Sequence, residues 1–302
     1  MTRLGTGLRL LPVGLRLLPV GLRLLGLGLA LLVAAAPHLV LLRLNRATGL
    51  MPALVHRAFL ALFGVRVRER GAPPEGAALI LSNHVSWLDI AVIGSRLPLS
   101  FVAKSEIAGW PVVGALARLQ RTVFIDRARR THTASVNSAL AARLAAGDRI
   151  VLFAEGTTGD GNRVLPFRAS LVGAARAALT EGGLDRVHLQ PLAIAYTRRH
   201  GLPVTRVERP DIAWYGDTDL APHLAAFLRG GHLDVELIWG EPVVFEAGSD
   251  RKRATARAEA TVRRLVRAAQ SGREPTILPE PDAGREPEQA VSEPILIRAR
   301  TA

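Results

Sequence analysis

The chain has 302 residues, 49% of them hydrophobic, and is long enough for one large domain with a substantial core. It contains no cysteine, which excludes disulfides, thiolate nucleophiles and cysteine-based metal sites. A net charge of +13 predicts an anionic partner: a phospholipid surface, an acidic carrier protein or a nucleic acid. Everything before Glu69 is cationic, polar or apolar, which favours a membrane over nucleic acid, and no aromatic-plus-basic RNA-binding pattern is present.

The first 23 residues form a cationic repeat leader. The heptapeptide Gly-Leu-Arg-Leu-Leu-Pro-Val occupies residues 7–13, recurs at 14–20 and begins again at Gly21. An arginine every seven residues among leucines suits a segment at a membrane interface. An ill-ordered leader is the alternative, because each repeat contains a proline that breaks a long helix.

Residues 24–64 are predicted to hold the chain at a membrane. Residues 24–42 are almost wholly apolar and lie between Arg23 and Arg43, close to the length of about 20 residues that a spanning helix needs. Residues 50–64 then predict an amphipathic helix, placed on the membrane surface or against the following domain.

Two other interpretations of this region stay open. Pro37 and His38 interrupt the apolar run, which leaves room for a re-entrant or peripheral hairpin instead of a span. The three alanines at 34–36 resemble a signal-peptide cleavage site. We expect a retained anchor, because a proline directly after that site disfavours cleavage.

Predicted strands and helices alternate over residues 65–270. The predicted strands are 65–70, 78–81, 99–103, 122–125, 149–153, 187–196 and 235–239, and the predicted helices are 86–93, 111–119, 130–146, 169–180 and 251–269. This pattern predicts an α/β domain with a mostly parallel or mixed central sheet flanked by helices. Sites in such sheets lie at the carboxyl ends of strands. Residues 271–302 are rich in Pro, Glu, Arg and Gly and predict a disordered tail.

The segment Asn83-His84-Val85-Ser86-Trp87-Leu88-Asp89 directly follows a predicted buried strand. A histidine beside an aspartate makes a general base, because the carboxylate fixes the ring tautomer and stabilises the imidazolium that forms. The alternative is a loop histidine without a role, with Ser86 and Asp89 forming a helix capping box. The two roles of Asp89 do not exclude each other.

Further candidate residues follow other predicted strands. Arg127 ends the segment 121–127 and is suited to an anionic head group, with a solvated strand end as the alternative. Lys104 is a similar cation, with the same alternative. The glycine-rich segment 153–161 can turn N–H groups toward an anion. In 189–196, Pro191 predicts the start or the edge of a strand.

Several site classes are excluded or disfavoured by their motifs. A Walker phosphate loop is excluded, because Asn162 stands after Gly161 where Gly-Lys-Ser/Thr would be needed. No Gly-x-Ser-x-Gly segment exists, which disfavours a serine hydrolase. No His-Glu-x-x-His or comparable ligand cluster exists, so we expect no catalytic metal.

Taken in order, the segments at 83–89, 121–127, 153–161 and 189–196 resemble the four blocks of the glycerolipid acyltransferases, the family that includes 1-acylglycerol-3-phosphate acyltransferase. The resemblance implies His84 and Asp89 as catalytic residues. The substrate-binding residues it implies are Arg127, Glu155, Gly156, Thr157 and Lys104. The chain departs from the family pattern at Arg121 in place of Gly, Ala154 in place of Pro and Thr158 in place of Arg.

The resemblance implies a membrane-associated O-acyltransferase without a cofactor. Acyl-CoA or acyl-carrier protein would donate the acyl chain, and a lysolipid in the bilayer would accept it, by default 1-acyl-sn-glycerol 3-phosphate. The expected location is the inner membrane, with the catalytic domain on its cytoplasmic face where the soluble donor is found. No nucleic acid is expected as a partner.

Two alternatives remain. Thr158, the segment 159–161, the segment 214–216 and His223 resemble the branch that acylates lyso-ornithine lipid. The alternative of another class is a basic membrane scaffold that keeps the acyltransferase fold without its activity.

Overall fold

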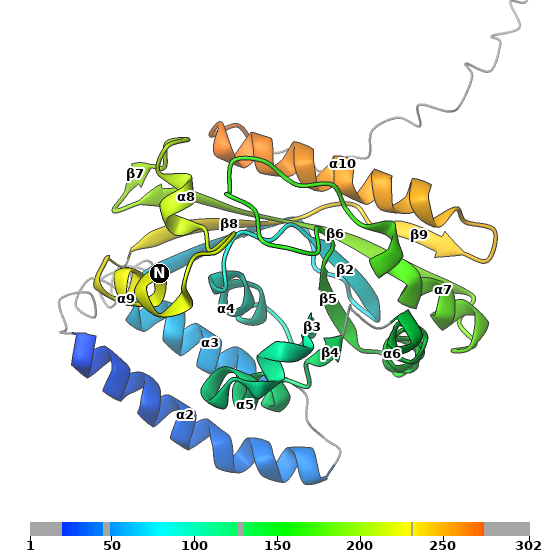
Figure 1. Ribbon diagram of the computed structural model, residues 1–302, viewed down its shortest axis with the longest axis horizontal. Coiled ribbons are helices and arrows are strands. Elements are labelled where there is room, and N and C mark those ends of the chain that lie inside the picture. The colour runs from blue at the N-terminus through cyan, green and yellow to red at the C-terminus, as the bar shows by residue number, and fades with distance from the viewer. Residues whose placement is uncertain (1–19, 45–48, 126–129, 231, 275–302) are drawn as a thin grey trace, which may run out of the picture.

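The computed structural model describes residues 20–44, 49–125, 130–230 and 232–274. The predicted repeat leader up to residue 19, the predicted tail from residue 275 and Arg127 lie outside these ranges. Within them the chain forms one mixed sheet with helices on both of its faces (Figure 1), which confirms the predicted fold class. The predicted domain limits at 65 and 270 stay predictions.

The strands of the described chain join one sheet in the order β1-β8-β6-β2-β5-β3-β4, with β7 and β9 also pairing with β6. Their bounds are β1 Val65–Arg70, β2 Ala78–Ser82, β3 Ser100–Lys104, β4 Val123–Ile125, β5 Arg149–Phe153, β6 Arg186–Arg199, β7 Leu202–Pro203, β8 Leu233–Trp239 and β9 Val243–Glu246. The central neighbours β6, β2, β5, β3 and β4 run parallel, whereas β8 and β9 run antiparallel to β6. The carboxyl ends of β2, β5 and β3 therefore meet at one edge.

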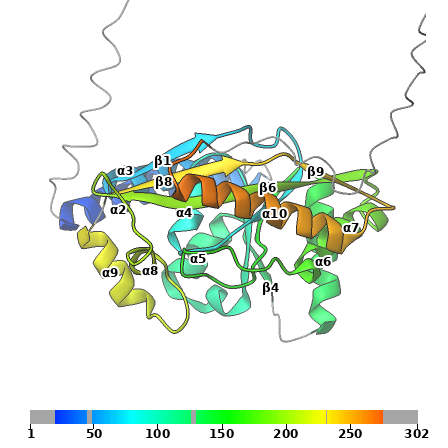
Figure 2. The same ribbon diagram turned by 90° about the horizontal axis from the view of Figure 1, so that it is seen from above.

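Helices cover both faces of the sheet (Figures 1 and 2). The helical elements are α2 Val20–Arg43, α3 Leu50–Leu62, α4 Leu88–Gly94, η1 Ser105–Gly109, α5 Pro111–Leu119, α6 Arg130–Ala145, η2 Ala169–Val172, α7 Gly173–Thr180, α8 Arg209–Ile212, α9 Leu220–Gly230 and α10 Arg251–Gln270. One buried core lies between the sheet and α6, α7 and α10, and a second lies between the opposite face and α3 and α4. The second core packs beneath the start of α4, where the candidate site begins.

The helix α2 is long and apolar enough to cross a membrane by length and composition, and almost none of its apolar stretch is buried in the protein. It continues through Pro37 and lies beside α3 (Figure 1). His38 is the exception to the exposure: its side chain is buried, and its Nε2 is 2.7 Å from the carbonyl oxygen of Leu119 at the end of α5. The imidazole of His38, which would be costly to bury in a membrane without a partner, therefore has a hydrogen-bond partner within the protein.

The prediction that Pro191 marks the start or the edge of a strand is wrong. Pro191 lies in the middle of β6 and pairs with Leu81 of β2. On one side, β6 pairs with β9 up to Leu189 and with β8 from Leu192 onward. Pro191, which lacks an N–H, faces the gap between these two strands. The proline therefore removes no ladder hydrogen bond. The short elements β7, β9, α8 and α9 carried no clear sequence pattern and were not predicted.

Candidate active site

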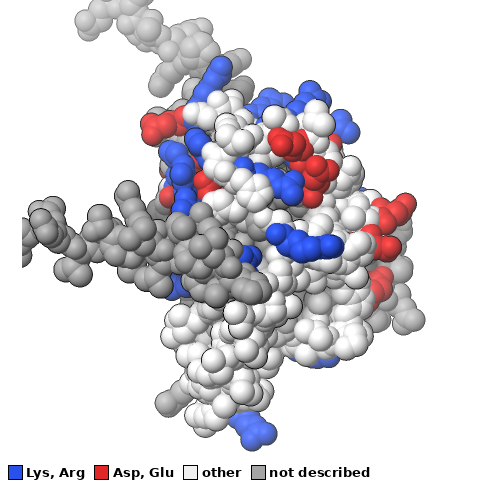
Figure 3. All heavy atoms as spheres, turned by 90° about the vertical axis from the view of Figure 1, so that its left-hand side faces the viewer, with Lys and Arg blue, Asp and Glu red and all other residues white. Residues whose placement is uncertain are grey.

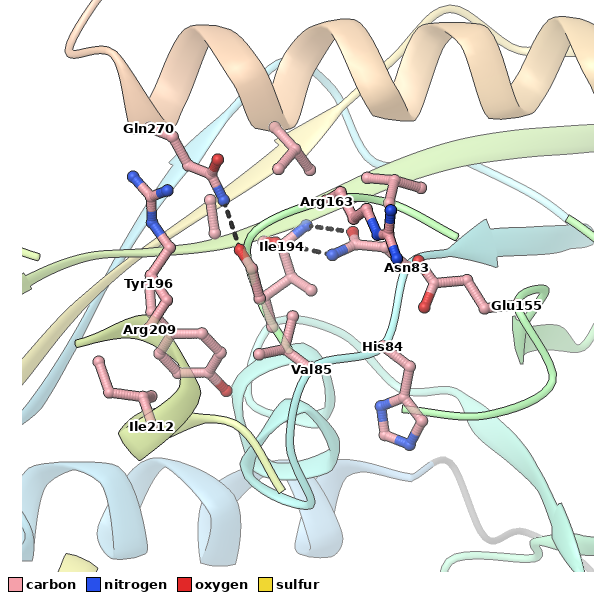
Figure 4. Close-up of a pocket in the computed structure, with 14 residues that line it drawn as sticks. Asn83, His84, Val85, Glu155, Arg163, Ile194, Tyr196, Arg209, Ile212 and Gln270 are labelled. Atoms are coloured by element: carbon pink, nitrogen blue, oxygen red, sulfur yellow. Dashed lines mark hydrogen bonds between the residues drawn. The ribbon is translucent and has the colours of Figure 1, made fainter. Parts of the chain in front are cut away.

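The loop that holds His84 leaves the carboxyl end of β2 and enters α4 at Leu88. Asn83 fixes the first residue of this loop against β6: its Nδ2 donates to the carbonyl oxygen of Ile194 at 3.0 Å, and its Oδ1 accepts from Ile194 N at 2.9 Å (Figure 4). Both groups are buried. The Asn83 side chain thus continues the pairing of β2 with β6 beyond the end of β2. This fixes the backbone directly before His84.

Asp89 is the centre of the site's hydrogen bonding. One oxygen, Oδ2, accepts from His84 Nδ1 at 2.8 Å, from the N–H of Val85 at 2.7 Å and from the N–H of Ser86 at 3.1 Å. The other, Oδ1, accepts from the hydroxyl of Tyr196 at 2.7 Å. The carboxylate is 0% exposed, so these four donors stand where water would otherwise solvate its charge.

The two alternative roles predicted for Asp89 are both present in part. Its carboxylate returns to the N–H of Ser86, which is one half of a capping box, while the same oxygen binds His84. The helix α4 begins at Leu88 rather than at the predicted residue 86, and its N-cap residue Trp87 makes no side-chain capping bond. The turn that caps the helix is therefore also the turn that orients the histidine.

The ring of His84 is held on two sides. It stacks on the ring of Phe153, with 3.7 Å between centroids and 10° between planes, and it donates from Nδ1 to Asp89. Because Nδ1 carries the proton in this bond, Nε2 keeps its lone pair for a substrate. The side chain is 18% exposed and points away from α10 (Figure 4). The arrangement is that of a general base with a fixed tautomer.

Tyr196 was not predicted as a site residue. Burial raises the pKa of its hydroxyl well above the usual value, and the nearby Asp89 charge raises it further, so the hydroxyl stays protonated and donates. The sequence carries only a weak signal for it, a tyrosine closing the apolar segment 189–196. Its partner is 107 residues away, and only the parallel pairing of β2 with β6 brings the two together.

Glu155 follows β5 and is 3% exposed. Its Oε1 accepts from the N–H of Leu165 at 3.0 Å, whereas Oε2 is buried and has no side-chain or backbone donor in good hydrogen-bond geometry within the described chain. Burial raises the pKa of this carboxyl to about 8, against the opposing N–H groups of Leu165 and His84. Glu155 therefore carries a proton at neutral pH.

The glycine-rich loop after β5 is bonded to the His84 loop. Gly156 turns the chain with a φ of 74°, which favours glycine, and the N–H of Gly159 donates to the carbonyl oxygen of His84 at 2.8 Å. Thr157 is exposed, and Thr158 is half-buried. The loop thus places Glu155 beside His84 and presents Thr157 to solvent.

The structure places the remaining predicted residues as follows. Lys104 ends β3, is exposed, and lies at the same sheet edge as the ends of β2 and β5. A pocket behind the His84 loop joins several of the residues above to α8 and α10 (Figure 4). Its lining consists of Asn83, His84, Val85, Glu155, Gly161, Arg163, Val164, Ile194, Ala195, Tyr196, Arg209, Ile212, Val266 and Gln270. Within the described ranges, no three His, Asp or Glu side chains gather closely enough to hold a metal ion.

Comparisons with known proteins place this arrangement in a family. The acyltransferase family model matches residues 64–195. The chain is 52% identical over 225 residues to the lyso-ornithine lipid O-acyltransferase of Brucella abortus, covering 74% of this chain and 84% of that protein. It is 43% identical over 217 residues to the enzyme of the same name from Rhizobium meliloti, covering 72% and 74%.

More distant similarities were also found. The chain is 38% identical over 124 residues to the 1-acyl-sn-glycerol-3-phosphate acyltransferase of Neisseria gonorrhoeae, covering 41% of this chain and 49% of that protein. A crystal structure of the 1-acyl-sn-glycerophosphate acyltransferase of Thermotoga maritima superposes with a TM-score of 0.49 at 21% identity, over 72% of this chain and 81% of that one.

The chain belongs to the acyltransferase family, as its four sequence blocks predicted. Within that family it is an acyltransferase of lysolipids. The roles given to individual residues stay predictions.

Proposed function

We propose that this enzyme transfers an acyl chain from a thioester to the hydroxyl of lyso-ornithine lipid. The observation that carries the transfer chemistry is the His84–Asp89 pair, with 2.8 Å between Nδ1 and Oδ2 and with Nε2 left unbonded to Asp89. Relatives of that name support this choice of acceptor, because they match at up to 52% identity over most of their length.

In the proposed mechanism, His84 Nε2 removes the proton of the acceptor hydroxyl as its oxygen attacks the thioester carbonyl in a ternary complex. Asp89 stabilises the imidazolium that forms. The N–H groups of Val85 and Ser86 donate to its carboxylate and hold it in place. When the tetrahedral intermediate collapses, the carbon–sulfur bond breaks. The leaving thiolate takes the proton from His84, which returns the base to its neutral form.

The head-group side of the site supports an acceptor without a phosphate. Thr158 stands where the family pattern has an arginine, so a cation suited to a phosphate is missing from the loop beside His84. The ornithine head group carries a carboxylate and an ammonium group instead. Arg127 and Lys104 remain our candidates for contacts with its carboxylate, together with Glu155, Gly156 and Thr157 for shaping the acceptor site.

Three of the features that resemble the lyso-ornithine branch contact the catalytic loop: the segments 159–161 and 214–216, and His223. The N–H of Trp214 donates to the carbonyl oxygen of Val85 at 2.9 Å, and Trp87 Nε1 donates to His223 Nδ1 at 3.1 Å. Gly159 is bonded to His84 as described. Residues scattered over the sequence thus gather around one loop, where differences in acceptor structure would be sensed.

We further propose that the enzyme works at the inner membrane with its catalytic domain on the cytoplasmic face. The apolar helix α2 supports the membrane location, and a soluble donor, acyl-CoA or acyl-carrier protein, supports the face. N-terminal sequencing of the mature protein tests whether α2 is retained as an anchor. A start at Pro37 would contradict a retained anchor.

The acceptor is tested with purified protein in detergent and a labelled acyl donor, offered as acyl-CoA and as acyl-carrier protein in parallel reactions. Each donor is combined with lyso-ornithine lipid or with 1-acyl-sn-glycerol 3-phosphate. We expect kcat/KM to favour lyso-ornithine lipid at least tenfold. Equal or preferred use of the phosphate acceptor would overturn the assignment of the acceptor, and transfer to neither would support an inactive scaffold.

A further inference from the structure

The helix α5 presents an apolar face that nothing in the described chain covers. Trp110, Val112, Val113 and Leu116 are 36%, 68%, 40% and 40% exposed, and residues 109–117 contain no charge. Isolated exposed apolar residues are ordinary on a protein surface, but a whole helical face of them marks an interaction site.

The α5 face is continuous with the apolar helix α2. His38 of α2 and the carbonyl oxygen of Leu119 at the end of α5 are 2.7 Å apart, so the two helices touch. Along α2 the exposed side chains are also large and apolar, among them Leu25, Leu32 and Val33. Figure 1 shows α2 at the bottom of the molecule. In the side view of Figure 3, this lower part of the surface is almost wholly uncharged.

The contact at His38 also fixes the depth of α5. His38 precedes Arg43, the cationic end of α2, by five residues, which at the rise of an α-helix is about 7.5 Å. If α2 lies in a bilayer with Arg43 at the head groups, Leu119 lies at the inner side of the head-group region. This depth holds for an α2 that crosses the bilayer steeply, because the rise along the helix axis then runs along the membrane normal.

Close packing against η1 sets which side of α5 faces outward. Gly114 lies against η1 so closely that an added Cβ would be 2.5 Å from the carbonyl oxygen of Ala108. The same carbonyl accepts from Arg118 Nη1 at 2.9 Å. The buried side of α5 is thus its glycine side, and the outward side is fixed as Trp110, Val112, Val113 and Leu116.

We propose that the α5 face is a second membrane contact, which enters the bilayer surface beside α2. A tryptophan at one end and Arg118 at the other are the residue types that sit at the boundary between head groups and acyl chains. The strand before α5 is β3, whose carboxyl end lies at the same sheet edge as the His84 loop. The contact therefore brings the site edge to the membrane, so that a lysolipid acceptor reaches it without leaving the bilayer. This inference rests on the proposed membrane location.

The absence of cysteine allows a direct test by single labels. Val112→Cys carries an environment-sensitive fluorophore, Leu25→Cys in α2 is the positive control, and Val244→Cys, an exposed valine in β9, is the negative control. Each labelled protein is mixed with vesicles of phosphatidylethanolamine and phosphatidylglycerol that contain bromine-labelled acyl chains. We expect the labels at 112 and 25 to be quenched and the label at 244 to stay bright.

The outcomes separate the two levels of the proposal. Quenching at 25 but not at 112 would overturn the α5 contact and leave the membrane location intact. No quenching at either site would overturn both. A functional readout is the double variant Val112→Glu/Val113→Glu, which should lose at least tenfold in kcat/KM on acceptor in vesicles and keep its activity on acceptor in detergent micelles. Val244→Glu is the matched control, and equal losses in the two variants would also contradict the proposal.

Discussion

The substitution Glu155→Gln tests the electrostatics of the site through stability. The carboxyl of Glu155 is 3% exposed, and burial raises its pKa to about 8 from 4.5. Glutamine has the same shape and no charge, and its amide oxygen can still accept from the N–H of Leu165. The variant therefore removes the titration of residue 155 and leaves the packing intact.

The sign and size follow from proton linkage. Between pH 4.5 and about 8 the folded protein holds a proton on Glu155 that the unfolded chain has released. Stability contributed by this raised pKa is therefore fully present below pH 4.5 and is lost as the pH rises toward 8. The loss is about 1.4 kcal/mol per pH unit and tapers as the pH approaches the folded pKa, so from pH 5.5 to 7.5 the wild type should lose about 2.5 kcal/mol relative to the variant.

The assay is thermal unfolding in detergent, followed by circular dichroism at pH 5.5, 6.5 and 7.5. A difference of about 2.5 kcal/mol corresponds to about 5–10 °C in Tm for a domain of this size. We expect the Tm of Glu155→Gln to rise relative to wild type as the pH rises, while Glu241→Gln, at an exposed position, follows the wild type. Parallel profiles for wild type and Glu155→Gln would refute a raised pKa at this position.

Three further substitutions probe the catalytic loop. Asp89→Asn should fold normally, because its amide oxygen can accept from the three donors now bound to Oδ2 while its NH₂ donates to Tyr196. Acyl transfer should fall by about two to four orders of magnitude, because the charge that stabilises the imidazolium is gone. An unchanged kcat would contradict that role. Tyr196→Phe should slow transfer about tenfold and shift the acidic limb of the pH–rate profile, because Asp89 loses one buried donor; a profile identical to wild type would show that the hydroxyl is only structural. Asn83→Ala should cost about 1–3 kcal/mol in the free energy of unfolding, since the backbone of Ile194 loses both of its hydrogen bonds to this side chain. Denaturant unfolding with no loss of stability would contradict it.

The sequence was sufficient for the part of the site that is local. His84 and Asp89 are five residues apart on either side of one turn, so the geometry of the turn brings them together without help from distant residues. Strands and helices with strong periodicity were likewise predicted close to their observed bounds, such as α5 and β5. In both cases the information lies within a short stretch of chain.

The rest of the site depends on which strands become neighbours. Tyr196 reaches Asp89 only because β6 pairs with β2, and Phe153 reaches His84 only because β5 lies on the other side of β2. The prediction for Pro191 was wrong for the same reason, because it also depended on which strands lie beside β6. A proline is tolerated there because it faces the gap between β9 and β8. Sheet order is a property of the whole domain, and no single motif contains it.

The most direct test of the account is the acyl transfer rate of His84→Ala beside wild type, measured on lyso-ornithine lipid with equal amounts of vesicle-bound enzyme. His84 is predicted to be the general base, so kcat should fall by at least about 100-fold while vesicle binding and Tm stay unchanged. Transfer at a rate within a few-fold of wild type by a folded, membrane-bound His84→Ala would contradict the central claim.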